Sequence, residues 1–127
     1  MNILANISIK RIYDPYEESD GYRILVDRLW PRGVSKEKAN LYCWAKDLAP
    51  SHELRKEFHH NIELFDEFRK RYKAELRSNE SIKSEFKRLS ELSLTNNITL
   101  LYAAKDPNYN NALVLKDEIV QYLTTKK

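Results

Sequence analysis

Charged residues follow four apolar stretches of this chain, each at the point where the stretch ends. The four charged segments are Lys10-Arg11 to Asp14, Asp27-Arg28, Lys46-Asp47 and Lys105-Asp106. Each segment brings a base and an acid together, and a rigid strand can aim the polar groups that follow it. If the apolar stretches are parallel strands of one sheet, the charged ends meet at a common rim, where open α/β sheets bind their ligands.

The basic side chains of these segments have the chemistry that a phosphate or carboxylate ligand needs. The residues that would surround one ligand are Arg28, Arg32, Lys46 and Lys105. Free backbone N–H groups at helix starts, predicted at Ser51 and Asp106, would add further donors. The alternative is that neighbouring acids and bases only neutralise one another in surface pairs, which contribute about 0 to 1 kcal/mol each.

Three aspartates stand in the same segments, at Asp27, Asp47 and Asp106. In an enzyme, one of them would act as a base or would bind Mg²⁺, a cation that prefers carboxylate oxygens. No metal-ligand spacing supports such a site, and we predict no metal. His52, His59 and His60 do not form an H-E-x-x-H pattern and are interpreted as solvated, with a general base at His59 as the alternative.

Other residues with reactive or planar side chains give weaker signals. Trp30 lies beside the charged segments, where it can stack on a planar part of a ligand or belong to the core. Cys43 has no adjacent base and is interpreted as a buried thiol rather than a nucleophile. With two glycines, the chain contains neither a P-loop nor G-x-G-x-x-G. The sequence therefore names no cofactor.

Length and composition indicate an ordinary globular protein. The chain has 127 residues, of which 42% are hydrophobic and 32% are charged, enough for one core. A formal charge of +3 permits an anionic partner without requiring one. One cysteine, an amino terminus without a signal-like apolar region and the lack of a long apolar run predict a soluble, cytoplasmic protein with no membrane partner.

The hydrophobic pattern predicts the elements that must position these residues. The predicted strands are residues 3–13, 22–27, 41–45 and 98–104. The predicted helices are a short one capped by Ser35, one capped by Ser51, two amphipathic ones over residues 62–76 and 82–92, and a last one with Asp106 as its cap and Pro107 at its first position. The clearest strand is 98–104, because its sequence ITLLYAA is almost entirely apolar.

Strands that are separated by helical connections generally pair in parallel. We therefore predict a small single α/β domain over residues 1–127, with a mostly parallel sheet of about four strands flanked by helices. The stretch from Ile62 to Arg77, which includes this helix, carries a set of basic side chains, namely Arg69, Lys70, Arg71, Lys73 and Arg77. A solvated face is the plain interpretation of this set, and a groove for nucleic-acid phosphates is the alternative.

Four long blocks of the chain carry a family resemblance. They are KRIYDP with SDGYRILVDRLWPRG, WAKDLAPSHELRKEFHH, FDEFRKRYKAEL and ITLLYAAKDPNYNNALVLKDEI, and they run from about Ile9 to Leu123. The blocks resemble the YeaO-like family, catalogued as domain of unknown function 488 (DUF488). The resemblance implies a small bacterial or archaeal α/β protein and supplies no established catalytic mechanism.

The resemblance also changes the set of candidate residues. Arg55 and Asn110 belong to the motifs of the family and join the predicted ligand-binding residues, whereas Cys43 does not belong to them. Similar proteins commonly carry a histidine where this chain has Tyr109. If that histidine is an acid–base catalyst, this chain would be impaired or would use the tyrosine hydroxyl instead.

Three functions remain open at this point. The first is a strand-end site for an anionic, phosphate-bearing small ligand, in a binding protein or in an enzyme that processes phosphoesters or nucleotides. The second is nucleic-acid binding through the basic helix and the strand-end arginines. The third is a non-catalytic interaction module whose charged residues form a buried ion-pair network. Under the first, Arg28→Ala and Arg32→Ala should abolish ligand binding and leave the melting temperature nearly unchanged.

Overall fold

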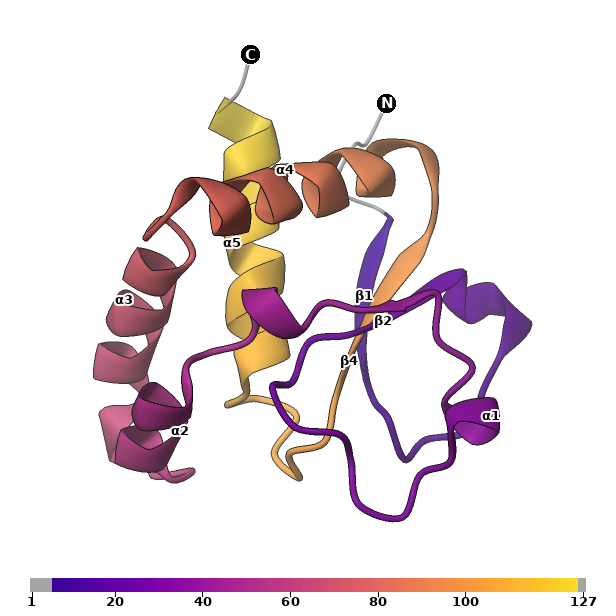
Figure 1. Ribbon diagram of the computed structural model, residues 1–127, viewed down its shortest axis with the longest axis horizontal. Helices are drawn as coiled ribbons and strands as arrows, with labels where there is room; N and C mark the ends of the chain where they lie inside the picture. The colour runs from indigo at the N-terminus through magenta and orange to yellow at the C-terminus, as the bar shows by residue number, and fades with distance from the viewer. Residues whose placement is uncertain (1–5, 126–127) are drawn as a thin grey trace.

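The computed structural model describes residues 6–125, and its centre is a four-stranded sheet (Figure 1). The strands are β1 (Ile7–Arg11), β2 (Tyr22–Leu25), β3 (Cys43–Trp44) and β4 (Ile98–Tyr102), and they lie in the order β1-β4-β2-β3. All of the pairings are parallel, which confirms the predicted α/β class. The carboxyl ends of β2 and β4 therefore lie side by side in the middle of the sheet.

The observed strands are shorter than the predicted ones. β2 ends at Leu25 and β4 ends at Tyr102, so Asp27 and Lys105 lie in the loops just beyond the strands. β3 is an edge strand of two residues. β1 begins at Ile7, and residues 3–5 of the first predicted strand lie outside the described residues.

The two central strands bury side chains on both faces of the sheet. Ile24 pairs with Leu100 and Leu25 pairs with Leu101 across β2 and β4. The first pair belongs to the main hydrophobic core and the second to a smaller core on the opposite face. All four side chains are 0% exposed, which explains why these strands read as continuous apolar runs rather than as alternating patterns.

Helices connect the strands and cover the main core. They are α1 (Lys36–Ala39), α2 (His52–Phe58), α3 (Phe65–Glu75), α4 (Glu80–Thr95) and α5 (Asn111–Thr125), with 3-10 segments η1 (Glu18–Asp20), η2 (Lys46–Leu48) and η3 (Ile62–Leu64). In Figure 1, α2, α3 and α5 lie to the left of the sheet and α1 lies to its right. α3 and α5 bury their apolar stripes in the main core, as the three-and-four spacing predicts. Between residues 6 and 125, no helix is long and apolar enough to cross a membrane.

The last helix begins later than the sequence pattern predicts. α5 starts at Asn111 and is capped by Asn110, whose Oδ1 accepts a hydrogen bond from the Leu113 N–H at 2.9 Å. Asp106 Oδ1 instead accepts a hydrogen bond from the Asn108 N–H at 2.9 Å and forms a local turn. The prediction that Asp106 caps this helix was therefore wrong. Asparagine and aspartate are equally good caps, so the pattern alone does not choose between them.

Candidate ligand-binding site

A cavity of about 830 Å³ opens at the carboxyl ends of β2 and β4. Its walls come from the loop after β2, from α2 and the proline before it, from α3, and from the loop that joins β4 to α5. The lining residues are Asp27, Arg28, Leu29, Pro50, His52, Arg55, Lys56, Phe58, His59, His60, Phe68, Ala103, Ala104, Lys105, Asp106, Asn110 and Asn111. Small-molecule sites are usually about 300 to 1,000 Å³, so this cavity is large enough for such a ligand.

The structure brings part of the predicted site together. The predicted site residues that line the cavity are Asp27, Arg28, Arg55, Lys105, Asp106 and Asn110. Those outside its lining are Trp30, Arg32, Lys46 and Asp47. Trp30 Nε1 donates to the Val34 carbonyl at 2.7 Å, and Lys46 Nζ lies 5.1 Å from the ring centre of Trp44. The residues that follow β2 and β4 therefore meet at the cavity. The charged residues that follow the edge strand β3, Lys46 and Asp47, lie outside the cavity lining.

Asp27 ties three elements together at the cavity. Its Oδ2 accepts a hydrogen bond from the Ala103 N–H at 2.9 Å, and its Oδ1 accepts one from Asn111 Nδ2 at 3.2 Å. Burial raises the pKa of the Asp27 carboxyl above its usual value, and these hydrogen bonds and the charges of Arg55 and His60 offset the rise only in part. The carboxylate therefore gains stability from any further donor that approaches it.

Asp27 and Asp106 are the two carboxylates of the cavity lining. The Asp106 backbone carbonyl accepts a hydrogen bond from Asn110 Nδ2 at 3.0 Å, which holds the loop before α5. In the part of the chain that the structure describes, no three His, Cys, Asp or Glu side chains are arranged to hold a metal ion.

Three arginines of the motif blocks donate to backbone carbonyl groups, two of them in loops and one at the end of α1. The pairs are Arg11 with Ala103 and Ala104, Arg23 with Ala39, and Arg28 with Ala49 and Pro50. Arg28 uses its Nε and one terminal nitrogen in bonds of 3.0 and 3.1 Å, so only part of its guanidinium remains for a ligand. These side chains hold the loops around the sheet in place.

Arg28→Ala should lower the free energy of unfolding by about 1 to 3 kcal/mol, because the carbonyl oxygens of Ala49 and Pro50 would lose their donor. This result, measured by urea denaturation, differs from the unchanged stability that the sequence suggests. The matched control is Arg32→Ala. Arg32 is exposed, and its guanidinium makes no hydrogen bond or ion pair within residues 6–125, so the change should be below about 0.5 kcal/mol. Equal stability of both variants would contradict the role assigned to Arg28.

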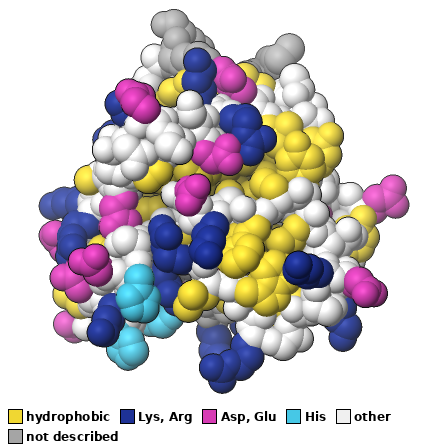
Figure 2. All heavy atoms as spheres, in the orientation of Figure 1, with side chains coloured by type: hydrophobic (Ala, Val, Ile, Leu, Met, Phe, Trp, Pro, Cys, Tyr) yellow, Lys and Arg dark blue, Asp and Glu magenta, His cyan; other side chains and the backbone are white. Residues whose placement is uncertain are grey.

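One face of α2 supplies most of the basic lining of the cavity. His52, Arg55, Lys56 and His59 are spaced by three and four residues, which places them on one side of the helix. His59 and His60 have φ angles of 42° and 57°, so two consecutive left-handed residues end the helix beside the cavity. Figure 2 shows the histidines gathered next to basic side chains. The sequence interpretation left out Lys56 and took the three histidines as solvated, with His59 as an alternative general base, although this spacing was the signal that places them on one side of the helix.

The start of α2 is not available to an anion. The Ser51 N–H and the Ser51 hydroxyl donate to the two carboxylate oxygens of Glu75, at 2.8 and 2.6 Å. Ser51 Oγ in turn accepts a hydrogen bond from the Leu54 N–H at 3.1 Å, which confirms it as the cap. The cap prediction was right, and the expectation of free donors at this helix start was wrong. A side chain from α3 already supplies the negative charge that the helix start favours.

Of the five basic residues on α3 and just after it, three are paired within the chain. Arg71 lies 2.6 Å from Glu57, while Lys73 and Arg77 lie 3.3 and 3.0 Å from the two oxygens of Glu118. Charges that are neutralised in this way contribute little to binding nucleic-acid phosphates. No observation on α3 therefore favours the nucleic-acid alternative.

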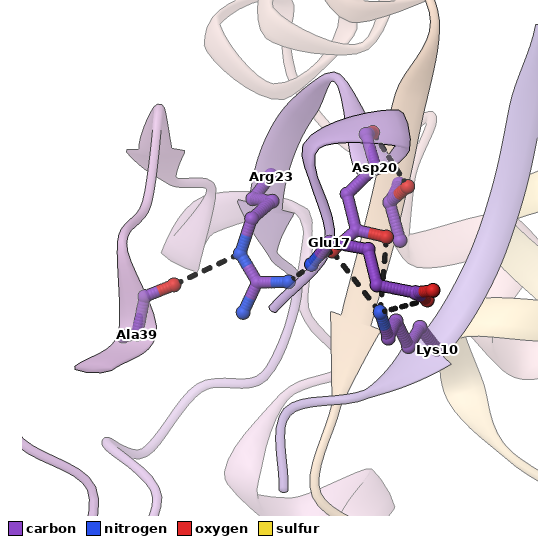
Figure 3. A network of polar contacts seen from close by, with 6 residues as sticks. Lys10, Glu17, Asp20, Arg23 and Ala39 are labelled. Carbon is purple, nitrogen blue, oxygen red and sulfur yellow. Dashed lines mark hydrogen bonds and ion pairs between the residues drawn. The ribbon is translucent and has the colours of Figure 1, made fainter. Parts of the chain in front are cut away.

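A second charged cluster is built around Asp20 and involves none of the cavity residues (Figure 3). Lys10 Nζ donates to both oxygens of Asp20 at 3.0 and 3.1 Å and to Glu17 at 3.0 Å. Arg23 donates to Asp20 and to the Ala39 carbonyl. Asp20 is 6% exposed and Arg23 is 2% exposed. The cluster is a buried ion-pair network that joins β1, η1, β2 and α1.

A protein-family model described as the inactive DUF488-N3 subclade matches residues 6–127. The chain belongs to the DUF488 family. Relatives of this DUF488 chain include the uncharacterized protein YeaO of Escherichia coli (strain K12), which is 52% identical over 112 residues, or 88% of this chain and 95% of YeaO. The uncharacterized protein Rv3073c of Mycobacterium tuberculosis (strain H37Rv) is 40% identical over 95 residues, or 75% and 80% of the two chains. No solved structure gives a significant match. The resemblance to the YeaO-like family is confirmed.

Tyr109 is the residue at which this DUF488 chain departs from the expected family histidine. Its ring meets the ring of Phe65 edge-on, with centroids 5.2 Å apart, and it is not among the residues that line the cavity. The structure therefore places the Tyr109 ring against α3 and not in the lining of the cavity.

Proposed function

We propose that this chain binds an anionic, phosphate-bearing small ligand in the cavity at the ends of β2 and β4. The observation that carries the proposal is the charge of the lining, in which four basic side chains outnumber two carboxylates and three histidines stand beside them. The side chains of Arg55, Lys56 and Lys105 make no hydrogen bond or ion pair with any residue from 6 to 125. Their donors are therefore free for the oxygens of a phosphate.

The start of α5 supports the same class of ligand. Asn110 and Asn111, the cap and the first residue of this 15-residue helix, both line the cavity. The start of a helix carries a partial positive charge and backbone N–H groups, and it favours a bound anion. This contribution comes in addition to the basic side chains of α2 and of the loop after β4.

We propose binding without chemical conversion of the ligand. The matching family model is described as inactive, a description of that subclade that we extend to this chain. Asp47 and Tyr109 do not line the cavity, and hydrogen bonds from Ala103 and Asn111 fix the Asp27 carboxylate in position as an acceptor. Of the three predicted catalytic aspartates, Asp106 lines the cavity and accepts a side-chain hydrogen bond only from its own loop, from the Asn108 N–H.

Inorganic phosphate should bind to the wild-type protein, and Arg55→Ala and Lys105→Ala should each weaken this binding about 10- to 100-fold. A hydrogen bond from a charged donor contributes about 1.5 to 3 kcal/mol, and each 1.4 kcal/mol changes an equilibrium constant about tenfold. Isothermal titration calorimetry at low ionic strength measures the dissociation constants.

The controls for this prediction are Lys46→Ala and Arg32→Ala, which remove basic side chains from outside the cavity. Both should leave the phosphate affinity within about twofold of the wild type, because charges that are exposed and distant are screened by solvent and salt. An absence of binding at millimolar phosphate, or an equal loss in the controls, would refute the proposed site.

A further inference from the structure

The amide of Asn111 has a defined orientation at the cavity. Asn111 Nδ2 donates one hydrogen bond to the Val26 carbonyl at 2.8 Å and another to Asp27 Oδ1 at 3.2 Å. Both hydrogens of the amide are thereby used, and the amide oxygen must point the other way. Within residues 6–125 this oxygen accepts no hydrogen bond, and Asn111 is a lining residue. Asn111 therefore offers a free acceptor to a molecule in the cavity.

The neighbouring group at the same wall is also an acceptor. The two oxygens of an aspartate can accept about four hydrogen bonds in total, and those of Asp27 accept one each, from Ala103 and Asn111. Asp27 is partly buried and lines the cavity. The side chains of Asp27, in the loop after β2, and of Asn111, the first residue of α5, thus form an acceptor wall. The basic side chains of α2 and Lys105 supply only donors.

The acceptor wall and the basic side chains favour a ligand that has two kinds of polar groups. An anionic group meets the basic side chains, and the acceptor wall needs O–H or N–H donors. An ammonium group would be repelled by the four basic side chains that share the cavity, so neutral hydroxyl groups are the better partners. A buried acceptor that a ligand leaves without a donor is unfavourable, and this gives the site a means of discrimination.

We propose that the ligand is a hydroxylated phosphate, such as a sugar phosphate or a nucleotide, whose hydroxyl groups donate to Asn111 Oδ1 and to the Asp27 carboxylate. This inference rests on the proposed function and adds the chemical class of the ligand. The cavity, at about 830 Å³, has room for either molecule.

The test compares two phosphate monoesters that differ in their hydroxyl groups. Ribose 5-phosphate and n-pentyl phosphate are titrated into the wild-type protein by calorimetry, and ribose 5-phosphate should bind at least about tenfold more tightly. Adenosine 5′-monophosphate separates the two sources of the ligand. Tighter binding of this nucleotide than of ribose 5-phosphate identifies a nucleotide, and equal or weaker binding identifies a sugar phosphate.

Asn111→Ala removes the free acceptor. It should weaken the binding of ribose 5-phosphate about tenfold and change the binding of pentyl phosphate less than about twofold. An equal loss for both ligands would overturn the role of Asn111, and if the variant does not fold, the comparison in the wild-type protein decides.

Equal affinity of the wild-type protein for the two monoesters would overturn the inference and leave phosphate binding intact. If neither monoester nor inorganic phosphate binds, the proposed function fails together with the inference. The two failures are therefore distinguishable.

Discussion

Gly21→Ala should lower the free energy of unfolding by about 3 to 5 kcal/mol, or prevent folding altogether, because the backbone has no space for a side chain there. A Cβ atom at Gly21 would lie 2.2 Å from the carbonyl oxygen of Asn97. That oxygen accepts a hydrogen bond from the Tyr22 N–H at 2.9 Å, so it cannot move away without opening the start of the β2–β4 pairing. Urea and thermal denaturation of the purified variant measure the loss.

The control for Gly21 is the other glycine of the chain. Gly33 also has a positive φ, +79° against +66°, but a Cβ atom there would meet nothing within 4 Å. Gly33→Ala should therefore lower the free energy of unfolding by only about 1 to 2 kcal/mol, the cost of a positive φ angle for a residue with a Cβ atom. Similar losses for the two variants would show that the contact with Asn97 is not the reason for glycine at position 21.

Asp20→Ala is expected to lower the free energy of unfolding by about 3 to 5 kcal/mol, since it would leave two cations without their shared partner. The Arg23 side chain is 2% exposed and the Lys10 side chain is 14% exposed, so water can replace the lost carboxylate only in part. Chemical denaturation near neutral pH measures this change. Glu17→Ala is the matched control, because Glu17 binds the same lysine from a side chain that is 67% exposed, and its loss should stay below about 1 kcal/mol.

The same carboxyl group predicts a dependence of stability on pH. Burial raises the pKa of Asp20, but hydrogen bonds from the Glu17 backbone, Lys10 and Arg23 outweigh it and hold the pKa below its ordinary value. The stabilisation is therefore complete above about pH 4 and declines as the pH falls through the lowered pKa. Asp20→Ala should lose this part of the acid sensitivity. Equal stability of the Asp20 and Glu17 variants would contradict the importance of the buried network.

The sequence carried enough information for the class of the fold. The apolar runs at Ile24 and Leu100 are buried from both sides, and such runs are distinctive of parallel strands between layers. The helices of residues 62–76 and 82–92 were recognisable because their apolar spacing is set by local geometry. The start of α5 could not be recognised from the sequence, because Asp106 and Asn110 are both good caps. The conformation of the loop after β4 decides which of the two caps the helix.

The position of the cavity was more predictable from the sequence than the set of residues that line it. Parallel strands bring their carboxyl ends to one rim, and this explains why Asp27, Arg28, Lys105 and Asp106 meet at the cavity. Lys46 does not join them, because β3 is a two-residue edge strand and its end leads into η2. The sequence also does not show which N–H groups of an arginine are already bonded within the protein. For Arg28 the acceptors are in a loop about twenty residues further along the chain.

Three arginines of the family motifs donate to backbone carbonyl groups, and this explains part of the family pattern by structure rather than by function. Arg11, Arg23 and Arg28 belong to the motif blocks, yet in this chain they brace the scaffold more than they face the cavity. A protein can keep such bracing residues while the side chains of the cavity change. Family membership here therefore predicts a shared architecture that these three arginines help to hold, and it does not by itself predict a ligand.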